Sequence, residues 1–286
     1  MHDNFVRVIV FLYLSSLMVY GDTLGIGIFQ PIINSTVPKK DYILGTTVFM
    51  KAITEDAGIE LSIVYYDDPR KLGEDFNSKK IDYIAADALT IVQNIPIANL
   101  ENGIMSFKDS KVDSQTLLII GLSNDARPMN EKLRGSVVSD GDVCSELYLQ
   151  TLLLQQSPGL EPNLILTKNA QQSLLKLFFE KADIALVDRA AYNLAIELNP
   201  QMKTKLTVLK MVPLTIGPIG YMRKGIDPDL REKIISLGKQ LNTTNRGKQL
   251  LQLFRASKMD DSYTKDLQNI YTLYAHYQTL IQGKKR

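Results

Sequence analysis

Histidine and cysteine are scarce in this chain of 286 residues, which contains two His and one Cys. His2 and His276 lie near opposite ends of the sequence, so acid–base or triad chemistry that depends on His is excluded. Cys144 has no second cysteine for a disulfide, and no Cys–His spacing typical of zinc is present. A Gly-rich phosphate loop ending in Lys is missing as well. We therefore expect neither an enzyme nor a protein with a bound cofactor or metal.

An excess of charge of either sign is missing too. The formal net charge is +2, without a basic cluster, which gives no electrostatic case for binding nucleic acid. Hydrophobic residues make up 45% of the chain and charged residues 22%, values that are ordinary for a folded globular protein. The length is enough for one large or two medium domains.

A long apolar segment occurs only at the start of the sequence, in residues 1–21. Its apolar stretch is too short to span a bilayer comfortably and is typical of a secretory signal peptide, which we expect to be cleaved after Gly21. An uncleaved membrane anchor is the alternative, because only Arg7 offsets Asp3 at the positive end. Cys144 lies far from this segment, so no lipid-modified Cys follows it. The predicted location is free solution in the periplasm.

A pattern of two Asp residues flanking four apolar or small residues occurs twice, from Asp82 to Asp87 and from Asp183 to Asp188. A continuous apolar run bounded by charge predicts a strand buried on both faces of an α/β sheet. Ligands of such sheets bind at the carboxyl ends of the strands. We therefore expect Asp87 and Asp188 at equivalent rims of two similar lobes that face one cleft. Chance recurrence of a common helix–strand boundary is the alternative.

The rest of the sequence alternates expected strands and helices, which predicts an α/β fold with mostly parallel sheets flanked by helices. The expected strands are residues 24–29, 61–66, 81–86, 115–122, 136–138, 163–167, 184–187, 206–211 and 216–222, and the expected helices are 42–57, 69–76, 145–156, 171–181 and one from residue 229. We expect a first lobe of residues 22–114 and 212–260, with the second lobe, residues 115–211, inserted into it. Residues 261–286 predict a C-terminal helix with a tyrosine-rich stripe that packs on the first lobe. A docking face for a partner protein is the alternative use of that stripe.

Four segments, in their order and spacing, resemble a known family. They are residues 132–138 (KLRGSVV), 182–192 (ADIALVDRAAY), 225–234 (GIDPDLREKI) and 247–251 (GKQLL). The sequence is similar to the phosphate, phosphite and phosphonate substrate-binding proteins of ABC transporters, which have the type II periplasmic binding protein fold. The resemblance runs from Leu24 to Ser257. It implies two lobes with a hinge and a ligand cleft between them, a monomer, and an ABC permease as partner.

One stretch departs from that family. A run of hydroxyl residues there opens the first helix of the second lobe and holds an oxyanion, which the N–H groups and dipole of a helix N-terminus favour. Here the corresponding residues, 140–147, keep only Ser145, while Asp140, Asp142 and Glu146 add negative charge. We therefore expect a small zwitterionic or amine-bearing solute more than a bare phosphate-like anion.

The predicted ligand-binding residues are Phe29, Gln30, Asp87, Asp140, Ser145, Glu146, Asp188, Arg189 and Tyr192. In the resembling family an acidic residue at the position of Asp188 engages an amino group of the ligand through a charge-assisted hydrogen bond. A helix N-cap is the alternative role for both Asp188 and Asp87. Arg189 adds a positive contact if it points inward, and is otherwise a solvated residue at a helix start. Phe29 and Tyr192 are expected to wall the cleft, with core packing as the alternative.

The preferred function is a periplasmic receptor that clamps a small polar solute between two lobes for an ABC importer. A ligand that bridges both lobes stabilises the closed form, and a transporter recognises that closed shape. The alternative is a sensory or interaction protein that uses the same clamp to signal to a membrane kinase or another partner. The tyrosine stripe after Asp261 and the altered hydroxyl run favour this alternative.

Overall fold

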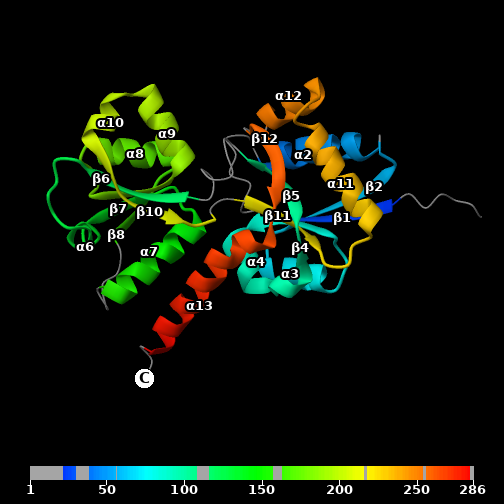
Figure 1. Ribbon diagram of the computed structural model, residues 1–286, viewed down its shortest axis with the longest axis horizontal. Coiled ribbons are helices and arrows are strands. Elements are labelled where there is room, and N and C mark those ends of the chain that lie inside the picture. Colours follow the sequence, from blue (N-terminus) through cyan, green and yellow to red (C-terminus); the bar gives the residue numbers. More distant parts are fainter. Residues whose placement is uncertain are drawn as a thin grey trace, which may run out of the picture.

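The computed structural model describes residues 22–29, 39–55, 57–107, 116–156, 163–215, 218–253 and 256–283. They form two α/β lobes side by side, each built on a five-stranded sheet, with a separate two-stranded sheet beside the first (Figure 1). The predicted signal segment and Gln30 lie outside the described residues. Within the described ranges, no helix combines the length and the apolar character needed to cross a bilayer.

The first sheet has the strand order β2–β1–β3–β11–β4. β1 pairs in parallel with β2 and β3, whereas β11 runs antiparallel to β3 and β4. The strands are β1 (Asp22–Phe29), β2 (Ile59–Tyr66), β3 (Tyr83–Asp87), β4 (Leu100–Glu101) and β11 (Pro218–Arg223), and the helices of this lobe are α2 (Lys39–Glu55), α3 (Pro69–Asn77), α4 (Ala88–Asn94), α11 (Pro228–Gln240) and α12 (Asn245–Leu253). The short β4 is preceded by η2 (Ile97–Asn99), and β5 (Gly103–Phe107) pairs with β12 (Lys258–Ser262) in the small sheet.

The second sheet repeats this plan with the order β10–β6–β9–β7–β8. β7 pairs in parallel with β8 and β9, whereas β6 runs antiparallel to β9 and β10. The strands are β6 (Thr116–Leu122), β7 (Ser136–Ser139), β8 (Asn163–Leu166), β9 (Ile184–Asp188) and β10 (Leu206–Pro213), and the helices are α6 (Met129–Lys132), α7 (Val143–Gln156), α8 (Ala170–Phe178), α9 (Arg189–Leu198) and α10 (Gln201–Lys205). Strand for strand, β8–β7–β9–β6 corresponds to β2–β1–β3–β11.

The duplicated Asp pattern occupies equivalent places in the two sheets. The carboxylate of Asp82 accepts a hydrogen bond from the N–H of Gly25 (3.1 Å) and forms an ion pair with Arg223 (2.8 Å). Asp183 likewise accepts from the N–H of Ser136 (2.7 Å) and pairs with Arg127 (2.6 Å). Each first Asp therefore fastens the start of β3 or β9 to the neighbouring parallel strand, and we call this arrangement the Asp clamp.

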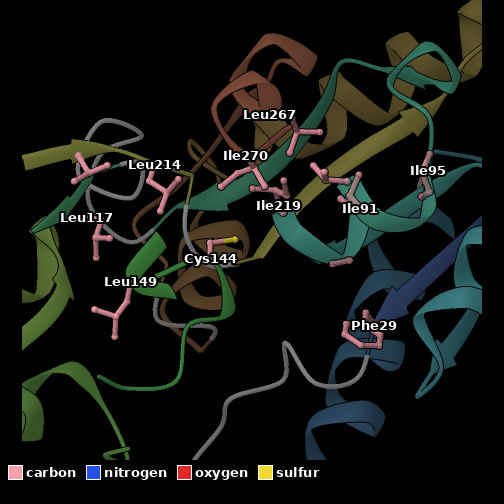
Figure 2. Close-up of a cluster of buried hydrophobic side chains, with 14 of the residues drawn as sticks. Phe29, Ile91, Ile95, Leu117, Cys144, Leu149, Leu214, Ile219, Leu267 and Ile270 are labelled. Carbon is pink, nitrogen blue, oxygen red and sulfur yellow. The ribbon is translucent and has the colours of Figure 1, made fainter. Parts of the chain in front are cut away.

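A hydrophobic core joins the two lobes. One cluster of buried side chains extends from Leu117 and Leu149 of the second lobe, through Cys144 and Ile270, to Ile91 of the first (Figure 2). The C-terminal helix α13 (Gln268–Gly283), entered through η3 (Thr264–Leu267), belongs to this cluster and contacts both α4 and α7. The prediction that this helix packs on the first lobe is therefore incomplete, because α7 belongs to the second lobe.

Candidate functional site

The two Asp residues that end the repeated pattern have the same local structure. Asp87 and Asp188 each follow a buried strand and stand at the N-cap of the next helix, with φ −69° and ψ 155° in both. The Asp87 carboxylate accepts hydrogen bonds from the N–H and the hydroxyl of Thr90, both at 2.7 Å. The Asp188 carboxylate accepts from the N–H of Ala191 at 2.6 Å. The capping role that the sequence left open is thus present at both residues, and it fixes where each carboxylate lies.

The start of α7 carries a third carboxylate cap. After β7 the chain turns through Gly141, whose φ of +83° favours glycine, and Asp142 then precedes the first residue of the helix. The N–H and the hydroxyl of Ser145 both donate to Asp142 Oδ1, at 2.8 and 2.9 Å. Ser145 is buried, so its hydroxyl is committed to this carboxylate. An internal carboxylate therefore occupies the N–H and the hydroxyl of Ser145, two donors that an oxyanion at this helix N-terminus could use.

The carboxyls around the start of α7 perturb one another. Burial raises the pKa of Asp140 to about 6, with further upward contributions from the charges of Asp142 and Asp188. Burial also raises the pKa of Glu146, and the charge of Asp142 adds to the effect. Both shifts mean that ionised carboxylates are held close together with incomplete solvation. The potential here is therefore negative.

The first lobe reaches the same place through α4. Cys144 on α7 is fully buried, and burial together with the charges of Asp142 and Asp87 raises the pKa of its thiol. A hydrogen bond from the backbone of Leu89, in the first turn of α4, acts on that pKa in the opposite direction. The charges of Asp87 from the first lobe and Asp142 from the second thus both act on Cys144, where the N-termini of α4 and α7 contact each other. We call this region the lobe junction.

The remaining predicted ligand-binding residues have contacts of other kinds. Phe29 ends β1 and is buried in the core cluster that joins the lobes (Figure 2). Tyr192 on α9 is half-buried and packs against the core of the second lobe. The guanidinium of Arg189 donates to the sulfur of Met211 on the edge strand β10, at 2.8 Å. The structure therefore places Phe29 and Tyr192 in the packing role that was the alternative, and engages Arg189 at the sheet edge. Gln30 lies outside the described residues.

Two features of the junction were not predicted. The contact between Cys144 and Leu89 joins residues far apart in the sequence, which carried no signal for it. The cap by Asp142 could have been found, because Asp is a preferred N-cap residue and an apolar helical run follows it. Among the described residues, no group of three or more His, Cys, Asp or Glu side chains is arranged to hold a metal ion.

A protein-family model described as "ABC transporter, phosphonate, periplasmic substrate-binding protein" matches residues 32–266. The chain belongs to this family. Its members are periplasmic solute-binding proteins of ABC transporters, so the predicted family and the predicted solute-binding function are both confirmed. No curated protein matches the chain.

Solved structures show the same fold at low sequence identity. XAC2383 from Xanthomonas citri bound to ATP is 10% identical, with a TM-score of 0.59 over 91% of this chain and 98% of that one. A binding protein component of an ABC phosphonate transporter from Pseudomonas aeruginosa is 15% identical, with a TM-score of 0.55 over 91% and 88%. PhnD1 from Prochlorococcus marinus in complex with methylphosphonate is 13% identical, with a TM-score of 0.55 over 88% and 97%. The predicted two-lobe, type II periplasmic binding protein fold is confirmed.

Proposed function

We propose that this protein is a monomeric periplasmic receptor that binds a small amine-bearing or zwitterionic solute at the lobe junction and presents it to an ABC permease. It reaches the periplasm through residues 1–21, which are removed after Gly21, and it acts by binding alone. The observation that carries the proposed solute class is the self-capped start of α7, where Asp142 takes the N–H and the hydroxyl of Ser145.

Electrostatics favour a cationic group at the junction. Two like charges about 6 Å apart near a protein surface repel by roughly 3 kcal/mol, and opposite charges attract by a similar amount. A phosphonate dianion beside Asp87, Asp140 and Asp188 would meet this repulsion, and the hydroxyl of Ser145 that could offset it is already bonded to Asp142. A protonated amine would instead stabilise the ionised carboxylates and offset the negative charges of Asp142 and Asp188, which add to the effect of burial on the pKa of Asp140.

The family and two of the structural relatives bind phosphorus compounds. XAC2383 is bound to ATP and PhnD1 is in complex with methylphosphonate. We propose that this chain differs in the ligand group held by the second lobe, because the donors of Ser145 at the start of α7 are already used internally. Asp188 is the proposed contact for the amine, and its position is set by the cap to Ala191.

Thermal unfolding of residues 22–286 with a panel of solutes tests the proposal. A ligand at about 100 times its Kd stabilises the folded state by roughly 2.7 kcal/mol, which raises Tm by about 5–10 °C for a protein of this size. We expect such a rise with amines or amino-phosphonates, and none with phosphate or methylphosphonate alone. A large rise with either simple anion and none with any amine would overturn the proposed solute class.

A charge-only substitution identifies the contact. Asp188→Asn keeps an N-cap residue but removes the negative charge, so we expect amine affinity to fall at least about tenfold with little change in stability. Asp227→Asn is the matched control, since Asp227 caps α11 through the N–H groups of Asp229 and Leu230. Equal loss of affinity in both variants, or no loss in Asp188→Asn, would remove Asp188 from the site.

A further inference from the structure

The C-terminal helix α13 packs against the first lobe and is hydrogen-bonded to it. Ile270 and Leu267 have no exposed surface and belong to the core cluster that joins the lobes. The hydroxyl of Tyr271 donates to the carbonyl of Ile95, just after α4, at 2.7 Å. The family match ends at residue 266, so α13 lies beyond the part of the chain that the family model matches.

The same helix also holds the segment by which the chain returns from the second lobe to the first. The side-chain amide of Asn269 donates to the carbonyl of Pro213, the last residue of β10, at 3.0 Å. The hydroxyl of Thr215, two residues further on, is buried and donates to the carbonyl of Asp266 in η3, at 2.7 Å. Any rotation of one lobe against the other has to move this return segment, and α13 is bonded to it.

A third set of contacts joins α13 to the second lobe. The helix packs along α7 (Figure 1), and the side chain of Gln155 in the last turn of α7 is in hydrogen-bond contact with that of His276 in the middle of α13. Figure 2 shows Ile270 between Leu149 of α7 and Ile91 of α4, within one cluster of buried side chains. Packed interfaces of this kind have discrete arrangements and do not deform continuously.

We propose that α13 is a strap that couples the two lobes, so that lobe opening requires release or sliding of the contact between α13 and α7. The strap holds the lobe arrangement in which α4 meets α7 and Cys144 is covered by the backbone of Leu89. Any effect of the strap on solute affinity rests on the proposed function, because it requires that the solute bind at the lobe junction. The mechanical coupling itself is independent of which solute binds.

The single cysteine gives a direct readout of lobe opening in the absence of ligand. Cys144 is the only thiol in the chain and is fully buried at the lobe junction, so a thiol reagent reacts when the lobes part. The double variant Gln155→Glu/His276→Glu places like charges across the strap contact, whereas Gln155→Lys/His276→Glu places opposite charges at the same positions. We expect Cys144 to react about three to ten times faster in the like-charge variant, since exposed charge pairs shift equilibria by this order.

Two single variants on α13 test its contact with the first lobe and provide a control. Tyr271→Phe removes only the hydroxyl that bonds Ile95, so the thiol rate is expected to rise in this variant as well. Thr272→Ala, on the exposed side of the same helix, loses only a bond to Gln268 within α13 and is expected to react at the wild-type rate.

The dependence of the thiol rate on urea separates lobe opening from global unfolding. Opening of the junction exposes little surface, so its urea dependence is small, whereas reaction through the unfolded state has the full dependence of unfolding. Equal rates in the two charge variants, or a rate that follows the global unfolding free energy in every variant, would overturn the strap. Neither result would bear on the proposed solute, because no ligand is present in this experiment.

Discussion

Asp140 is held at the lobe junction at the expense of folding stability, and Asp140→Asn is expected to make the protein more stable at neutral pH. The pKa of this carboxyl is about 6, against an ordinary value of 3.8, because burial and the charges of Asp142 and Asp188 disfavour ionisation. A shift of about 2 pKa units corresponds to roughly 3 kcal/mol. The side chain is partly exposed, and solvent screens part of the effect, so we expect a gain of about 1–3 kcal/mol.

The sign of the effect depends on pH. Below about pH 3 the carboxyl is protonated in both the folded and the unfolded state, and it does not weaken the fold. As the pH rises from about 4 to about 6, the unfolded state loses this proton while the folded state keeps it, so wild-type stability falls. Above about pH 7 both states are ionised and the fall is complete. Asn at this position cannot ionise. The advantage of Asp140→Asn is therefore expected to be near zero at about pH 3, partial at about pH 4.5 and complete above about pH 7.

Urea unfolding followed by circular dichroism at pH 4.5 and pH 7.5 measures this difference directly. Asp140→Glu is the control, since it keeps an ionisable group and should retain the wild-type dependence on pH. An advantage of Asp140→Asn that is the same at both pH values would refute the electrostatic account of the junction. So would a loss of stability at pH 7.5.

Two further predictions concern ligand binding and the Asp clamps. A bound amine stabilises the ionised form of Asp140, so amine affinity is expected to rise as the pH increases from about 5 to 7, with release of a proton on binding. Titration calorimetry in buffers of different ionisation enthalpy measures both the affinity and the number of protons released. An affinity that falls as the pH rises contradicts the amine assignment. Asp183→Asn and Asp82→Asn each replace a charged acceptor of hydrogen bonds by a neutral one, and each is expected to lower the free energy of unfolding by roughly 1.5–3 kcal/mol in urea titrations. Wild-type stability in both variants would show that the clamps do not fasten the sheets.

Much of the fold could be predicted from the sequence because buried parallel strands have a strong local signature. The continuous apolar runs that end at Asp87 and Asp188 gave the positions of β3 and β9, and each is followed by the helix that an N-cap role for its Asp implies. The start of α7 was placed two residues late, at Ser145 instead of Val143, because the capping role of Asp142 was not recognised.

Features that depend on distant residues were not predictable. The ion pairs of Asp82 and Asp183 join positions 141 and 56 residues apart, and nothing in the local pattern identifies their arginine partners. The insertion of β11 between β3 and β4 and the contact of α13 with α7 are likewise long-range. For the site, the sequence indicated an excess of negative charge near residue 140. The sequence also placed Asp87 at a rim facing Asp188, and the fold adds that the charge of Asp87 acts on Cys144 at the start of α7.

The position of β11 has a consequence for the order in which the chain matures. All five strands of the second sheet lie between residues 116 and 213, so this sheet can assemble as soon as that stretch of the chain is available. The first sheet has to wait for residues 218–223 to fill the slot between two strands made more than a hundred residues earlier. Until then, the edge of β3 is an unprotected template for pairing with other chains. Mispairing with other chains during folding is therefore expected to start mainly in the N-terminal third of this protein.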